Sequence, residues 1–319
     1  MTRLAAVDCG TNSIRLLIVE VSGQEIREIV RTMKIIRLGQ GVDATGQLDP
    51  AAIERARVAL REYVDKMKRE YVQAVRMVAT SATRDAENKD DFFNMTAELL
   101  GEITPGARAE VISGEEEAAL SFQGAVADLP AAAGPFCVID LGGGSTEFVV
   151  GESDGTLLGA HSAQMGCVRL TERIMRSDPP TQSEIEIAQD YVRERIGEVV
   201  KIVPVEKTHT FVGCAGTFTT LAALALGLEA YDARAIHDSR LRFEALKVLT
   251  NQLISETSTQ RAAHPVMHPG RADVIAGGSV VVNGIIEMIQ RHTDATDIVI
   301  SEKDILDGII AGLAKELAA

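Results

Sequence analysis

The feature that most constrains the fold of this chain is the stretch from Phe136 to Val150, FCVIDLGGGSTEFVV. An apolar run ends at Asp140, a Gly-Gly-Gly-Ser-Thr loop follows, and a second apolar run begins after Glu147. This order predicts a strand, a tight turn and a second strand. Glycines permit positive φ and close approach of the backbone to a ligand, so the N–H groups of such a loop can converge on a phosphate. An ordinary glycine-rich hairpin has the same pattern.

The same pattern occurs near the N-terminus, where residues 4–20 read LAAVDCGTNSIRLLIVE. An apolar run again ends at an acidic residue, Asp8, and a short polar loop separates it from a second apolar run. Such an internal repeat predicts two related domains. We expect each domain to contribute one loop to a shared site, so that the loops bind the two ends of one phosphate-bearing ligand. Asp140, at the end of the strand before the triple-glycine loop, suits a divalent metal or a water, because hard cations take oxygen ligands.

Length and composition limit the class of protein. The chain has 319 residues, 46% of them hydrophobic, which is enough for two globular domains. A net charge of −14 argues against general nucleic-acid binding. The sequence has neither a membrane-spanning apolar stretch nor the basic and apolar regions of a signal peptide. The four cysteines form no close pair and no zinc spacing, which predicts thiols in a reducing cytoplasm.

Local signals predict individual elements. Asp49 followed by Pro50 predicts the start of a helix, because Asp caps a helix and proline fits its first position. The buried face of this helix is predicted to comprise Ile53, Ala56, Leu60, Val64, Met67 and Tyr71. Thr181 and Glu184 have the spacing of a capping box ahead of another long helix. Residues 25–38 are predicted to form a strand with a break near 32–34.

Composition also predicts where the domains meet. Residues 125–135 are rich in Ala, Gly and Pro, and they are predicted to connect an N-terminal domain, 1–124, to a C-terminal domain, 125–302. The terminal helix predicted within 303–319 is able to pack back on the first domain.

Two further loops in the first half are candidates for function. The hydroxyl-rich loop Thr80–Asp85 contains Arg84, whose guanidinium could pair two phosphate oxygens, and a helix-capping turn is an equally good interpretation. Three glutamates, Glu115 to Glu117, open a predicted helix. Acidic residues are common there because of the helix dipole, but successive side chains point about 100° apart. One of them can therefore face a cleft and serve as a general base.

The second half adds another candidate turn. A predicted buried strand leads into Gly213–Thr217 and then a helix, which is either an anion site or a packing turn. Gly216 in this turn and Arg271, at the start of a later helix with paired glycines, are additional candidates for ligand binding.

Taken together, several blocks resemble the exopolyphosphatase and guanosine pentaphosphate phosphohydrolase family. They are VDCGTNSIRLL (7–17), ATSATRDA (79–86), EVISGEEEA (110–118), VIDLGGGSTEFV (138–149), MGCVRLTE (165–172), GCAGTFTTL (213–221) and RADVIAGG (271–278). The resemblance covers nearly the whole chain in order. It implies an α/β fold of two ribonuclease-H-like domains of the actin-like ATPase superfamily with an interdomain cleft, in agreement with the repeat.

The resemblance also implies roles for matching residues. The last glutamate of the SGEEEA block, Glu117, matches the catalytic base. Asp140 and Glu147 match acidic residues tied to the attacking water and the metal, Mg²⁺ or Mn²⁺, and Arg84 matches an arginine near the phosphates. The residues implied to bind phosphate are Gly10, Thr11, Asn12, Ser13 and Arg15 in the first loop and Gly142, Gly143, Gly144, Ser145 and Thr146 in the second. Asp8 is a further candidate.

The reaction implied is hydrolysis of terminal phosphoanhydride bonds of inorganic polyphosphate. Guanosine pentaphosphate is the close alternative substrate, because the shared motifs contact phosphates and not a base. A related kinase is disfavoured by the SGEEEA block, and a non-catalytic polyphosphate or nucleotide sensor is disfavoured by the intact Glu117 and loops. We expect no nucleic-acid or membrane partner, and a homodimer stays open.

Overall fold

The structure, a computed structural model, describes residues 1–23 and 25–318, which form two compact units. The first unit is Met1–Leu120 together with the chain from Ile305 onward, and the second is Ser121–Asp304. The division falls inside helix α5 (Gly114–Ala125), whereas the sequence placed it in the connector that follows. A continuous helix therefore carries the chain from one unit into the next.

The first unit is a mixed sheet in the order β3-β2-β1-β4-β5 with helices packed on it. Strand β1 is antiparallel to β2 and parallel to β4, and β4 is parallel to β5. Its elements are β1 (Thr2–Cys9), β2 (Ser13–Ser22), β3 (Glu25–Ile35), α1 (Val42–Thr45), α2 (Pro50–Arg69), β4 (Ala74–Ala79), α3 (Ser81–Asp85), α4 (Lys89–Leu100), β5 (Ala109–Val111), the first turns of α5, and α13 (Ile305–Ala318).

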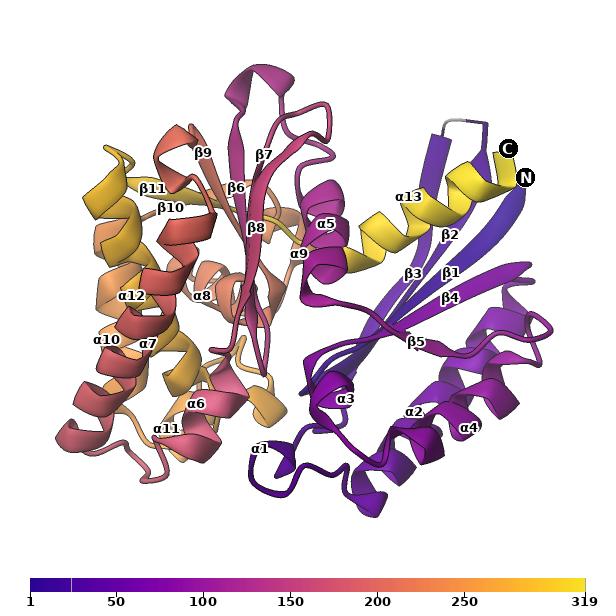
Figure 1. Ribbon diagram of the computed structural model, residues 1–319, viewed down its shortest axis with the longest axis horizontal. Helices are drawn as coiled ribbons and strands as arrows, with labels where there is room; N and C mark the ends of the chain where they lie inside the picture. Colours follow the sequence, from indigo (N-terminus) through magenta and orange to yellow (C-terminus); the bar gives the residue numbers. More distant parts are fainter. Residues whose placement is uncertain (24, 319) are drawn as a thin grey trace. The chain divides into compact units, whose positions relative to one another are not determined.

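Both faces of this sheet are buried, which explains the continuous apolar run of β1. Val7 belongs to the cluster formed with α2 and α4, whereas Leu4 and Ala6 pack with Ile309 of α13. Alternate residues of a strand point to opposite faces, so a strand covered on both sides must be apolar throughout. Figure 1 shows α2 and α4 on one side of the sheet and the yellow helix α13 on the other. The terminal helix thus packs on the N-terminal sheet.

The second unit repeats this plan. Its sheet has the order β10-β11-β9-β6-β7-β8, in which β6 is antiparallel to β7 and parallel to β9. Read from β8, the first strands follow the same arrangement as β3-β2-β1-β4, in agreement with the predicted repeat. Its elements are the end of α5, η1 (Ala131–Ala133), β6 (Phe136–Leu141), β7 (Thr146–Gly151), β8 (Leu157–Ala163), α6 (Cys167–Arg173), α7 (Gln182–Ile202), η2 (Val205–Lys207), β9 (Thr210–Cys214), α8 (Ala215–Ala225), α9 (Ala233–Ile236), β10 (Ser239–Arg242), α10 (Phe243–Ser255), α11 (Ser258–Ala262), η3 (Pro269–Arg271), α12 (Ile275–His292) and β11 (Asp297–Ile300). The predicted α/β class is confirmed.

Local predictions succeed at caps and fail where tertiary contacts decide. Asp49 accepts a hydrogen bond from Ala51 N at 2.8 Å with Pro50 at the first helical position, as predicted. The predicted break in the third strand is wrong, because residues 32–34 stay paired with β2. Tyr71 is not core. Helix α2 ends before it, its φ is +54° and it is 80% exposed, while Tyr63 is buried and donates to Ile14 O.

Candidate active site

The parallel strands of the first unit bring three loops to one edge of its sheet. Cys9 pairs with Ala79, and Ala79 pairs with Val111, so β1, β4 and β5 end together. The chain leaves these ends as the loop 10–13, the segment 80–84 and the start of α5. Ligands of open α/β sheets bind beyond the carboxyl ends of such strands. The sequence candidates of the first half therefore gather at a single edge.

The first hairpin loop is closed by a hydrogen bond from Gly10 N to Ser13 O at 2.9 Å. Directly below the loop, Asp8 and Arg15 are cross-strand partners. Arg15 donates to Asp8 Oδ2 from Nη2 at 2.6 Å and from Nε at 3.0 Å, and Asp8 is only 5% exposed. The predicted phosphate ligand Arg15 therefore also neutralises the acidic residue at the end of β1.

The structure distinguishes among the three glutamates of α5. Glu117 is buried, whereas Glu115 and Glu116 are exposed. Arg84 Nη1 donates to Glu117 Oε2 at 2.7 Å and to Ile112 O at 3.0 Å. Glu116 instead pairs with Arg76 at 2.8 Å. An arginine from the predicted phosphate-contact segment thus holds the predicted base in place.

Two polar atoms beside this pair are buried without a hydrogen-bond partner in the described chain. They are Nη2 of Arg84 and Oγ1 of Thr83. Buried donors are almost always satisfied in native proteins, so each unsatisfied one needs an explanation. A guanidinium with one N–H group on a carboxylate and another unsatisfied can bind an oxygen of an anionic ligand. This arrangement favours phosphate contact over the simple capping turn for residues 80–84.

The second hairpin loop has the same closing bond, from Gly142 N to Ser145 O at 3.0 Å. Among residues 1–23 and 25–318, the N–H groups of Gly143, Gly144 and Ser145 donate to no acceptor. Consecutive unsatisfied N–H groups form a concavity suited to an anion. The hydroxyl of Thr146, another predicted ligand, donates to Met165 O and so anchors the start of β7.

Asp140 and Glu147 are cross-strand partners in the same register as Asp8 and Arg15. Both are buried, and each accepts a serine hydroxyl: Ser121 Oγ donates to Asp140 at 2.6 Å, and Ser162 Oγ donates to Glu147 at 2.7 Å. Like charges directly opposite on a sheet are destabilising, and a cation between them relieves the repulsion.

The Asp140–Glu147 pair could hold a Mg²⁺ ion whose remaining ligands are water and substrate oxygens. Within the described residues, no group of three or more His, Cys, Asp and Glu side chains could hold a metal by itself. Mg²⁺ is commonly held by one or two carboxylates, with water and substrate phosphates completing its shell. The two carboxylates therefore suit a metal that arrives with a phosphate ligand.

The additional candidates Gly216 and Arg271 lie at the same edge of the second sheet, where β9 ends. A Cβ on Gly216 would fall 2.3 Å from Nη2 of Arg271. Only a glycine at this position therefore lets the guanidinium pack on the first turn of α8. Arg271 Nη1 also donates to Thr220 Oγ1 at 2.7 Å. Ala215, the first residue of α8, has φ +69°, which is strained for a residue with a side chain.

Several contacting residues were missed by sequence reasoning. Ser121 lies one helical turn after Glu117 on α5, and Ser162 is the register partner of Glu147 on β8. Arg169 donates from Nε to Gly144 O at 2.7 Å. Strand register could have found Ser162, because it follows from aligning β8 with β7. The other two depend on helix packing, for which the local sequence gives no signal.

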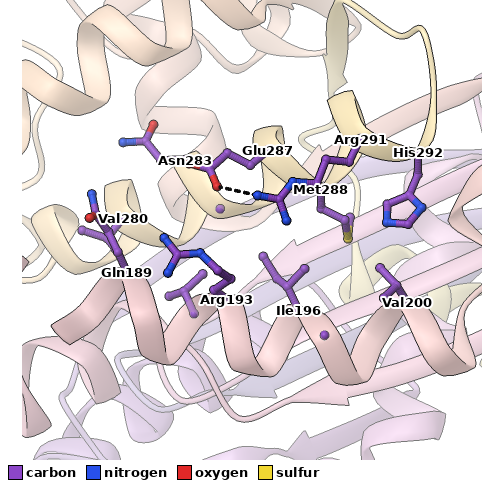
Figure 2. Close-up of a pocket in the computed structure, with 13 residues that line it drawn as sticks. Gln189, Arg193, Ile196, Val200, Val280, Asn283, Glu287, Met288, Arg291 and His292 are labelled. Carbon is purple, nitrogen blue, oxygen red and sulfur yellow. Dashed lines mark ion pairs between the residues drawn. The ribbon is translucent and has the colours of Figure 1, made fainter. Parts of the chain in front are cut away.

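A cavity of ≈ 110 Å³ lies elsewhere, between α7 and α12. Figure 2 shows its lining, with Arg291 directed toward Glu287, and contains none of the candidate site residues. Its lining combines apolar residues, such as Val192, Ile196 and Met288, with polar and charged side chains from both helices. It is a gap in helix packing and not the candidate site. In the part of the chain that the structure describes, no helix is long and apolar enough to cross a bilayer.

Comparisons with known proteins agree over nearly the whole chain. The model of the Ppx/GppA phosphatase family matches residues 17–316. Exopolyphosphatase 2 of Mycobacterium tuberculosis is 52% identical over 318 residues, covering 98% of this chain and 99% of that protein. The crystal structure of an exopolyphosphatase-like protein has a TM-score of 0.92 at 39% identity, covering 99% of this chain and 100% of its own. The Aquifex aeolicus Ppx/GppA family member has a TM-score of 0.78 at 29% identity, covering 99% and 98%.

Proposed function

This chain belongs to the Ppx/GppA phosphatase family, and we propose that it is an exopolyphosphatase that releases orthophosphate from the ends of inorganic polyphosphate. The substrate is inferred from the name of the relative that is 52% identical over nearly the full length of both chains. The observation that carries the chemistry is the buried Glu117, bound by an arginine that keeps one buried N–H group unsatisfied.

In the proposed reaction, Glu117 accepts a proton from water as the water attacks the terminal phosphoryl group. The ion pair with Arg84 fixes the direction of the Glu117 carboxylate, which a general base needs. The unsatisfied Nη2 of Arg84 binds an oxygen of the same phosphoryl group. Phosphoanhydride hydrolysis proceeds through a loose transition state, so positioning and charge stabilisation account for most of the catalysis.

The loops of the two hairpins bind phosphates in this proposal. The unsatisfied N–H groups of Gly143, Gly144 and Ser145 would donate to phosphate oxygens. Asp140 and Glu147 would hold Mg²⁺ or Mn²⁺, which when bound neutralises charge on the phosphates. The shortened polyphosphate is already a good leaving group, so no general acid is required.

The test is the variant Glu117→Gln, assayed for phosphate release from short and long polyphosphate, guanosine pentaphosphate and ATP, each with and without Mg²⁺. Losing a general base costs about 10²- to 10⁴-fold in rate, while binding and folding should persist. The exposed neighbours Glu115→Gln and Glu116→Gln are matched controls and should retain most activity.

The outcomes separate the candidate functions. Near-normal turnover in Glu117→Gln would contradict the role of this residue. Preference for guanosine pentaphosphate over polyphosphate would make the nucleotide the substrate. Tight polyphosphate binding by the wild-type protein without any phosphate release would indicate a sensor.

A further inference from the structure

In each unit, the segment that follows the third strand of the sheet donates hydrogen bonds to the carbonyls of the hairpin loop. In the second unit this segment is Gly166–Arg169, after β8. The Gly142 carbonyl accepts from Cys167 N at 3.1 Å, and the Gly143 carbonyl accepts from Val168 N at 2.9 Å and Arg169 N at 3.1 Å. The Gly144 carbonyl accepts from Arg169 Nε. Every carbonyl of the triple glycine is thus bound by the start of α6.

These bonds determine where the loop N–H groups point. In a trans peptide the C=O and the following N–H point in opposite directions. Since the carbonyls of residues 142–144 face α6, the N–H groups of Gly143, Gly144 and Ser145 face away from it. These are the same three N–H groups that have no acceptor in the described chain.

The first unit has the same device after β3. The Thr11 carbonyl accepts from Gly39 N at 2.8 Å, and the Asn12 carbonyl accepts from Ile36 N at 3.0 Å and Arg37 N at 2.9 Å. The N–H groups of the following residues, Asn12 and Ser13, are therefore directed away from this segment. Both loops are oriented through their carbonyls.

A glycine permits the close approach in each case. A Cβ on Gly166 would lie 2.3 Å from Gly143 O, 2.4 Å from Gly143 C and 2.6 Å from Gly144 N. The φ of Gly166 is −137°, which any residue adopts, so only this contact requires glycine. A Cβ on Gly39 would lie 2.4 Å from Thr11 Cγ2 and 3.0 Å from Ala82 Cβ. Gly166 meets backbone, whereas Gly39 meets mainly a side chain that can rotate.

We infer that Gly166 and Gly39 are positioning residues. Each glycine lets the segment after the third strand of its sheet bind the carbonyls of the hairpin loop. The loop N–H groups then point toward phosphate. The phosphate part of this inference rests on the proposed function. A side chain at residue 166 would displace the peptide between Gly143 and Gly144 and misdirect its N–H group. A misplacement of about 1 Å near the reacting atoms costs about 10²-fold in rate.

The experiment compares Gly166→Ala and Gly39→Ala with two matched glycine-to-alanine controls. The controls are Gly197 of α7, in the second unit, and Gly312 of α13, in the first. A Cβ at either control position would meet no atom within 4 Å. Each variant is measured for amide hydrogen exchange in the peptides spanning 10–13 and 142–146, for Tm, and for kcat and KM on tripolyphosphate with Mg²⁺.

We expect Gly166→Ala to accelerate exchange only in 142–146 and to lower kcat/KM by about 10²-fold. Gly39→Ala should accelerate exchange in 10–13 with a smaller loss, about tenfold, because Thr11 can rotate away. Both controls should match the wild-type protein in loop exchange and kinetics, with a small rise in Tm, because Ala is more stable than Gly inside a helix by about 0.5–1 kcal/mol. Unchanged loop exchange and kinetics in both loop variants would overturn the inference, as would a uniform loss of stability with normal kinetics per folded molecule.

The experiment still supports or overturns the inference if Gly166→Ala does not fold or if the wild-type protein does not hydrolyse polyphosphate. If Gly166→Ala does not fold, Arg169→Lys removes the Nε donor to Gly144 O while keeping the charge, and exchange at 142–146 should still rise. If the wild-type protein does not hydrolyse polyphosphate, the proposed function fails, and the exchange data alone still support or overturn the positioning role.

Discussion

The β1–β2 and β6–β7 hairpins share their register and closing hydrogen bond but differ in the charge of one cross-strand pair. Each is closed by a glycine N–H donating to a serine carbonyl three residues later, and each pairs an aspartate of the incoming strand with a charged residue of the outgoing strand. In the first hairpin that charged residue is Arg15, which forms an ion pair with Asp8. In the second it is Glu147, which faces Asp140 with its negative charge. One cross-strand position therefore separates a hairpin with an ion pair from one with two opposed carboxylates, which we propose to hold the metal.

The difference teaches how a repeated unit can acquire two roles. The register and the closing hydrogen bond are backbone features, and they persist whatever the side chains are. The charge of the pair depends on a single residue. The first hairpin therefore joins its backbone and hydroxyl groups to an Asp8–Arg15 ion pair, whereas the second joins them to two carboxylates.

Among variants of the two hairpins, the largest expected effect comes from replacing Asp140, with Asp8 as the matched comparison. Asp140→Asn should lower kcat/KM by about 10²- to 10³-fold, since a bound metal contributes several kcal/mol of charge stabilisation. Asp8→Asn should cost at most about tenfold, because Asp8 is bound by Arg15, whose positive charge disfavours a cation at this position. Phosphate-release kinetics over a range of Mg²⁺ concentrations measure both. Equal losses would contradict the division of roles.

Stability without metal should change in opposite directions. Arg15→Leu leaves the buried Asp8 without its ion pair and should destabilise the protein by about 3 kcal/mol. Glu147→Gln relieves the repulsion with Asp140, so it should leave the free energy of unfolding unchanged or raise it. Urea unfolding in the presence of a chelator tests this contrast. A large destabilisation by Glu147→Gln would show that the two carboxylates do not repel.

Metal binding should stabilise the protein through the carboxylates of the second hairpin and not through the first. Mg²⁺ at 100 times its dissociation constant should stabilise the wild-type protein by about 2.7 kcal/mol, seen as a rise in Tm. The rise should disappear in Glu147→Gln and persist in Ser13→Ala, which changes the other loop. A rise of equal size in both variants would place the metal elsewhere.

The smallest effects should come from the loop hydroxyls. Ser13→Ala and Ser145→Ala should each weaken substrate binding by roughly one hydrogen bond, about 1 kcal/mol or more where the acceptor is a charged oxygen. The KM for tripolyphosphate measures the loss at each loop. If neither variant alters KM, the hydroxyls stabilise the loop conformation and do not bind the substrate.

Local sequence signals were sufficient for the capped helices and for the repeat. The capping residues Asp49 and Thr181 begin helices as predicted, because their side chains bond backbone groups within the same turn. The two acidic-glycine hairpins were visible because a strand, a tight turn and a strand form a contiguous pattern. Tyr71 was misassigned because helical spacing alone cannot tell where α2 stops.

The sequence by itself determined the α/β units, the paired loops and the set of candidate residues. Only the tertiary structure decided that Glu117 and not its two neighbours is buried against Arg84, that Arg15 is bound to Asp8, and that Gly39 and Gly166 touch the loops. These contacts join segments far apart in the chain. Their geometry follows from strand register and helix packing, which are set by burial of the whole core and leave no local trace in the sequence.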